Sequence, residues 1–157
     1  MNEDNHHPDR KHPAHHAFVE GSNRTTILFL TVCTHHRKAI LANESMHHAL
    51  LEAWRAAEQW RVGRYVVMPD HIHLFCTPTH RESENIAKWV AYWKRLVSLK
   101  QPDLQPIWQR DCWDTQLRRH ESYTEKWSYA RNNPVRAGLV EHVDDWQFQG
   151  VVHHLPW

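Results

Sequence analysis

Residues 64–77 read RYVVMPDHIHLFCT. The first five residues favour a strand, the Pro-Asp pair favours a tight turn, and HIHLFCT favours a returning strand. Side chains alternate between the two faces of a strand, so His71 and His73 share one face while Ile72 points to the other. At about 3.3 Å per residue their Cα atoms lie about 6.6 Å apart, close enough for both imidazoles to bind one cation. The stretch predicts a sheet with one apolar face and one imidazole-bearing face.

The flanking sequence predicts the remaining elements. In chain order these are a strand at 25–34, a helix at 44–60 with Asn43 as its N-cap, a helix at 83–100, a short strand at 115–118 and a helix at 121–132. The first six elements follow the order of a ferredoxin-like split βαβ sheet. We therefore expect an α+β fold with helices on one sheet face, plus a C-terminal tyrosine-bearing helix. The tail from residue 140 onward is expected to pack irregularly.

Composition limits the organisation of the chain. The sequence has 157 residues, of which 41% are hydrophobic and 24% charged, as expected for one globular domain. We expect a flexible His-rich arm at 1–22, a domain at 23–150 and a C-terminal tail at 151–157. The formal net charge is +1, so any nucleic-acid site must be a local basic patch. Three cysteines form no CxxC pair, which points to a reduced, cytoplasmic setting. No apolar run reaches the roughly 20 residues of a membrane span.

The histidine pair alone leaves several interpretations open. His71 and His73 could be half-exposed strand residues with no chemical role. Histidine-triad nucleotide hydrolases use His-x-His-x-His, but the third position here is Phe75. Other enzymes combine a histidine pair with a distant tyrosine nucleophile.

A second stretch, WSYARNNPVRAGLV at 127–140, bears on this choice. Together with MPDHIH at 68–73, WQRDCWDTQLR at 108–118 and the ESY that follows, it resembles the HUH-type single-tyrosine transposases of small bacterial insertion sequences. Within them it is most similar to the REP-associated tyrosine transposases. The resemblance covers roughly residues 25–146. It implies a ferredoxin-like nuclease domain that acts on single-stranded DNA and recognises palindromic REP hairpins.

The resemblance also implies roles for individual residues. His71 and His73 match the metal-binding histidines, Tyr129 matches the catalytic tyrosine, and Asn133 matches the position of a third polar ligand. Two imidazoles and an amide oxygen leave coordination positions open for phosphate and water, as catalysis requires. The expected cofactor is a divalent metal ion, with Mn²⁺ favoured by the imidazoles and Mg²⁺ usable in the cell. Asn133 could instead be only a helix C-cap before Pro134.

The implied reaction is cleavage and rejoining of single strands through a 5′-phosphotyrosine intermediate. A tyrosine nucleophile splits one difficult phosphodiester step into two easier ones. Tyr123 is a competing nucleophile, but it is six residues from Tyr129, so the two side chains point about 120° apart on a helix.

Basic side chains supply the candidate DNA contacts. They are Arg118, Arg119, Arg131 and Arg136 near the proposed chemistry, and Lys94 and Arg95 on the second helix, whose basic side could equally be a solvated face. The expected partner is single-stranded hairpin DNA, bound by a monomer or a homodimer. The rival functions are a non-catalytic DNA-binding module and a metal-dependent phosphohydrolase acting on nucleotides with water as nucleophile.

Overall fold

A computed structural model describes residues 26–117 and 120–155. The His-rich arm expected at 1–22, together with Arg118 and Arg119, lies outside the described residues. The elements are β1 (Ile27–Cys33), η1 (His35–Arg37), α1 (Glu44–Ala56), β2 (Trp60–Val67), β3 (His71–Pro78), α2 (Ile86–Lys100), η2 (Pro102–Leu104), β4 (Trp113–Leu117), α3 (His120–Arg131), α4 (Asn133–Arg136), η3 (Val143–Asp145) and β5 (Gln149–Val151). None of the helices in the described part of the chain is long and apolar enough to cross a bilayer.

Five antiparallel strands form one sheet in the order β4-β1-β3-β2-β5. Up to β4 the chain follows the order β1-α1-β2-β3-α2-β4, which is the ferredoxin-like arrangement. The central pairing joins β1 to β3, with Thr31 opposite His73 and Cys33 opposite His71. The α+β fold predicted from the sequence is confirmed.

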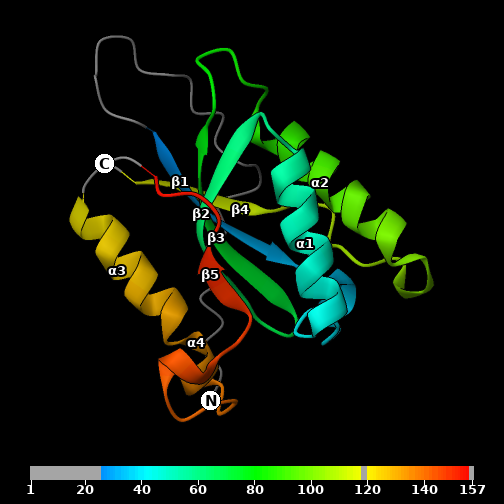
Figure 1. Cartoon of the computed structure of the whole chain (residues 1–157), viewed down its shortest axis with the longest axis vertical. Helices are drawn as coiled ribbons and strands as arrows, with labels where there is room; N and C mark the ends of the chain where they lie inside the picture. The colour runs from blue at the N-terminus through cyan, green and yellow to red at the C-terminus, as the bar shows by residue number, and fades with distance from the viewer. Residues whose placement is uncertain (1–25, 118–119, 156–157) are drawn as a thin grey trace.

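Helices cover both faces of this sheet (Figure 1). α1 and α2 pack together on one face, and α3 lies against the opposite face. The larger core lies beneath α1 and α2 and includes the β3 residues Ile72, Leu74 and Cys76. A smaller core lies beneath α3 and includes Phe75. The alternation of β3 therefore divides its side chains between two layers.

Local sequence signals explain where the two long helices begin. The Asn43 side chain accepts a hydrogen bond from the Met46 amide at the start of α1, as predicted, and Asn85 does the same for Lys88 at the start of α2. α1 nevertheless ends at Ala56, and Trp60, expected as its last residue, begins β2.

The prediction of an irregular tail is wrong at one point. Residues 149–151 form β5, which pairs with the edge of β2. Gly150 lies opposite Tyr65, where a Cβ would come within 3.0 Å of the tyrosine hydroxyl oxygen. A three-residue strand that contains glycine carries almost no periodic signal, so the tertiary pairing determines it.

Candidate active site

The histidine pair, His71 and His73, lies on the sheet face that α3 covers. The two ring centroids are 4.8 Å apart. Ile72 and Leu74 are fully buried on the opposite face. The alternation predicted for this strand therefore places both imidazoles together.

His71 is held by Asp70 and approached by Arg37. Its Nδ1 lies 2.7 Å from Oδ1 of Asp70, and Arg37 Nε donates to Oδ2 of the same carboxylate at 2.9 Å. Burial lowers the pKa of His71, although the hydrogen bond with Asp70 opposes this. For Asp70, burial acts to raise the pKa, but hydrogen bonds with His71 and Arg37 outweigh it and the pKa is lowered. An ionised Asp70 accepting from Nδ1–H leaves the Nε2 lone pair of His71 available.

His73 is more deeply buried, with 7% of its surface exposed. Its Nδ1 lies 3.0 Å from Oγ1 of Thr31, the residue opposite it on β1, and its ring stacks on Phe29 at 5.2 Å between centroids. Burial lowers the pKa of His73 to about 3, helped by nearby His71 and Arg136. The imidazole is therefore neutral at pH 7, the state in which histidine binds metal ions.

Tyr129 is presented by α3 beside this pair. Its ring centroid lies 6.2 Å from that of His73, and the residue is 57% exposed. Arg136 lies over the tyrosine ring at 4.2 Å and its Nη2 donates to the Tyr129 carbonyl oxygen at 2.5 Å. Tyr123 instead packs on Phe75, with ring centroids 4.4 Å apart. Of the two tyrosines on α3, Tyr129 is the one beside the histidine pair.

Asn133 reaches the same point from the start of α4. Its Nδ2 lies 3.0 Å from Nε2 of His71. α3 ends at Arg131, and Asn133 and Pro134 begin the next short helix, where proline is tolerated because a first-turn N–H has no intrahelical partner. The alternative that Asn133 only caps α3 is therefore wrong.

The ring nitrogens of the two histidines and the amide of Asn133 are the candidate ligands for a metal ion. Asp70 and Thr31 engage the Nδ1 atoms, so the Nε2 atoms of both histidines can serve as ligands, a common arrangement at metal sites. Across residues 26–117 and 120–155, no three His, Cys, Asp or Glu side chains gather as a metal site. The amide of Asn133, whose nitrogen lies 3.0 Å from His71 Nε2, is the candidate for a third protein ligand at the histidine pair. The donor set fits a divalent cation with open coordination positions.

The chain is similar in sequence to known proteins. No protein-family model matches the chain. The REP-associated tyrosine transposase of Escherichia coli K12 is 27% identical over 123 residues, which span 76% of this chain and 73% of that protein. A Haemophilus influenzae protein of the same family name is 30% identical over 95 residues, spanning 52% and 53% of the two chains.

This chain is similar to the REP-associated tyrosine transposases.

A solved structure supports the fold of these transposases for the chain. The REP-associated tyrosine transposase bound to a REP hairpin superposes with a TM-score of 0.68 at 24% identity, covering 83% of this chain and 81% of that one. The resemblance inferred from the sequence motifs is thus confirmed.

Lys94, predicted as a DNA contact on this transposase-like fold, is not on the exposed basic side of α2. It is 7% exposed, and its ammonium donates to the Gln109 carbonyl oxygen at 2.9 Å. Burial lowers the pKa of Lys94. A signal for this was present, because Lys94 lies four residues after Val90 and three before Val97 on the apolar stripe. The exposed placement expected for Lys94 is wrong.

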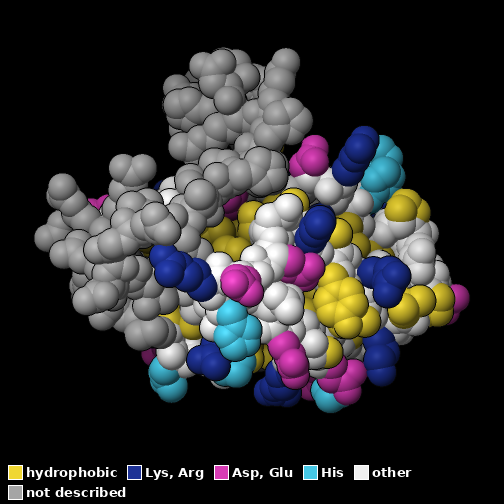
Figure 2. Space-filling view, turned by 90° about the horizontal axis from the view of Figure 1, so that it is seen from above, with side chains coloured by type: hydrophobic (Ala, Val, Ile, Leu, Met, Phe, Trp, Pro, Cys, Tyr) yellow, Lys and Arg dark blue, Asp and Glu magenta, His cyan; other side chains and the backbone are white. Residues whose placement is uncertain are grey.

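The other predicted DNA contacts differ in position. Arg95 is exposed, but α2 lies on the sheet face opposite α3. Arg131 forms an ion pair with Asp144, whereas Arg136 lies against Tyr129. Their DNA-binding roles stay predictions. On the face shown in Figure 2 the basic and acidic side chains of the described residues are interspersed.

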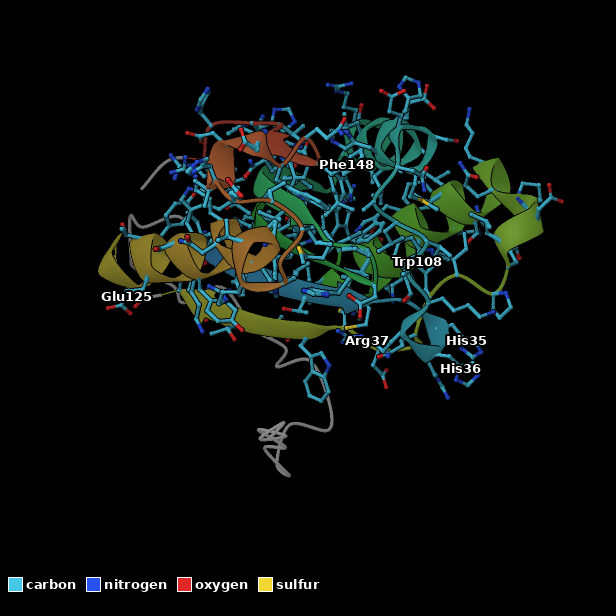
Figure 3. The ribbon with its side chains drawn as sticks, turned by 90° about the horizontal axis from the view of Figure 1, so that it is seen from below. His35, His36, Arg37, Trp108, Glu125 and Phe148 are labelled. Carbon is cyan, nitrogen blue, oxygen red and sulfur yellow. The ribbon has the colours of Figure 1, made fainter. Side chains whose placement is uncertain are left out.

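Arg37 was missed by sequence reasoning. It ends η1 in a left-handed conformation (φ 52°), which costs a non-glycine residue on the order of 1 kcal/mol. In Figure 3 its side chain lies on the sheet side of η1, while His35 and His36 lie on the outer side. Its Nη1 contacts Cys33 Sγ at 3.1 Å and its Nη2 is 3.5 Å from His71 Nδ1. Only the β1–β3 pairing brings Arg37 to this site, so local sequence could not predict it.

Proposed function

We propose that this protein is a DNA transposase and single-strand endonuclease that recognises hairpin, REP-like palindromic DNA. It cleaves and rejoins single strands through a 5′-phosphotyrosine intermediate. The observation that carries the proposal is the position of Tyr129, an exposed phenol 6.2 Å from the ring of His73, on a helix whose continuation brings Asn133 to His71.

The histidine pair and Asn133 would hold the divalent metal ion. Asp70 orients His71 and Thr31 orients His73, so both rings keep a fixed direction before any ligand arrives. The amide of Asn133 can present its oxygen after a half-turn about its terminal torsion. When bound, Mn²⁺ or Mg²⁺ would act as a Lewis acid on the phosphate and position it.

Tyr129 would supply the nucleophile. Its phenolic oxygen forms a bond to phosphorus while the bond from phosphorus to the 3′ oxygen breaks, and the phenolic proton ends on the 3′ hydroxyl. The products are a 5′-phosphotyrosine and a free 3′ end. Attack by a 3′ hydroxyl on this link would rejoin strands by the reverse step, so no external energy source is needed.

Arg136 and Arg37 would bind the phosphates on either side of the reacting bond. Arg136 fixes the position of Tyr129 through its backbone carbonyl and its ring. Arg37 is anchored by Asp70, yet half of its side chain is exposed. Such side chains hold the strand without reading its sequence.

The proposed partner is single-stranded hairpin DNA, and the names of the relatives and of the solved neighbour support it. Whether the active form is a monomer or a homodimer stays a prediction. The experiment that tests the proposed function asks whether cleavage leaves the protein attached to DNA through Tyr129. Neither rival function would form that bond.

A further inference from the structure

Trp113 is a large aromatic side chain on the surface. It begins β4, the edge strand beside β1, and is 51% exposed. Tryptophan is highly buried on average in folded proteins. An exposed indole at a sheet edge therefore needs an explanation beyond the packing of the core.

The strand register places Trp113 in line with the candidate active site. Trp113 lies opposite Thr31 on β1, and Thr31 lies opposite His73 on β3. Residues directly opposite one another in a sheet share a face, and Leu117 at the other end of β4 belongs to the core beneath α3. With strands about 4.8 Å apart, the Cα atoms of Trp113 and His73 are about 10 Å apart.

Arg37 lies on the same face of the sheet as Trp113. Its Nη1 contacts Cys33, which shares a face with Thr31 because the two are two residues apart on β1. The Arg37 side chain is half exposed. Lys126 of α3 lies over Phe29, the ring on which His73 stacks. Trp113 and these two cations therefore lie on the sheet face of the candidate active site, and basic side chains together with an exposed aromatic ring are the combination that binds single-stranded nucleic acids.

We propose that Trp113 is the stacking platform for a base of the single strand next to the scissile phosphate. This inference rests on the proposed function, because the histidine pair and Tyr129 would hold that phosphate. A span of about 10 Å across two strand spacings lets neighbouring nucleotides of one strand contact both places. Stacking accepts any base, so Trp113 would position the strand and leave recognition of the hairpin to other contacts.

The test measures binding to two probes in EDTA by fluorescence anisotropy. One is a GC-rich DNA hairpin with a single-stranded thymidine tail, and the other is the same hairpin with an abasic tail. Trp113→Ala should weaken binding to the thymidine probe by about 5- to 150-fold and leave binding to the abasic probe unchanged. Trp113→Phe should retain most of the affinity, because its ring can still stack.

Tyr92→Ala is the matched control. Tyr92 is also an exposed aromatic (40%), but it belongs to α2 on the other face of the sheet, so its loss should change neither affinity. If Trp113→Ala binds the thymidine probe as tightly as the wild type, the inference is overturned. The same result combined with loss of a dimer in size-exclusion chromatography would assign Trp113 to self-association instead. Wild-type protein that binds neither probe would contradict the proposed function as well.

Discussion

The amide nitrogen of Asn133 lies 3.0 Å from Nε2 of His71. The two residues come from different layers, since His71 begins β3 and Asn133 begins α4 immediately after α3. Asp70 holds the other ring nitrogen of His71. The junction between α3 and α4 therefore fixes a polar side chain against the histidine pair.

This contact predicts different effects for two substitutions of Asn133. Asn133→Ala removes the third oxygen donor and should weaken Mn²⁺ binding, measured by isothermal titration calorimetry. Asn133→Asp supplies a carboxylate oxygen in the same position and should bind Mn²⁺ at least as tightly as the wild type. Equal affinities for the wild type and both variants would exclude Asn133 as a ligand.

Asp70 is expected to act on the metal site through His71. Asp70→Asn weakens the hydrogen bond that orients the ring, and loss of such a partner lowers metal affinity by about 10- to 100-fold. Asp144→Asn is the control, because that carboxylate also pairs with an arginine, Arg131, but belongs to η3 and not to the turn before His71. A Mn²⁺ affinity in Asp70→Asn equal to that of the control would show that the carboxylate only shapes the turn.

Arg136 and Arg131 form a matched pair for DNA binding. Arg136 lies against Tyr129, whereas Arg131 is engaged by Asp144. Arg136→Ala should weaken binding of single-stranded DNA and reduce the salt dependence of log K by about 0.7, the effect of losing one phosphate contact. Arg131→Ala should change both quantities less. Anisotropy titrations at several salt concentrations measure the affinity and its salt dependence. A larger effect of Arg131→Ala than of Arg136→Ala would contradict the placement of the DNA strand beside Tyr129.

Lys94 should have no part in DNA binding, because its ammonium is buried against Gln109. Lys94→Met keeps a long side chain in the apolar stripe of α2 and should leave DNA affinity unchanged. Circular dichroism would check that the variant is folded. A loss of affinity in a folded Lys94→Met variant would restore Lys94 as a contact.

The sequence predicted those features that depend on local periodicity. Alternation placed His71 and His73 on one face and Ile72 on the other, and helical spacing separated Tyr129 from Tyr123. The order of elements then indicated the ferredoxin-like sheet. The strand alternation and the helical spacing follow from the chain alone because side-chain direction repeats every two residues in a strand and every 3.6 in a helix.

Features that depend on contacts between distant segments were not predictable in this way. β5 forms only because β2 offers an unpaired edge, and Arg37 reaches the site because β1 lies beside β3. The position of α3 on the face opposite α1 and α2 likewise depends on the small core around Phe75. Lys94 shows the limit of residue type as a guide, since its place on the apolar stripe outweighed its charge.

The central claim is that the phenolic oxygen of Tyr129 attacks the DNA and becomes covalently bound to it. Trapping of this covalent intermediate tests the claim most directly. A hairpin oligonucleotide with single-stranded flanks is labelled at its 5′ end in one reaction and at its 3′ end in another, incubated with protein and Mn²⁺, and separated on a denaturing gel. The wild type should give a protein-sized labelled band only with the 3′-labelled DNA, because the protein becomes attached to the fragment that lies 3′ of the cut. Tyr129→Phe removes one exposed oxygen, so it should still bind DNA and form no such band. Tyr123→Phe should retain it, because Tyr123 packs on Phe75. An adduct formed by Tyr129→Phe, or wild-type cleavage into two free fragments at every time point, would contradict the account and favour a phosphohydrolase.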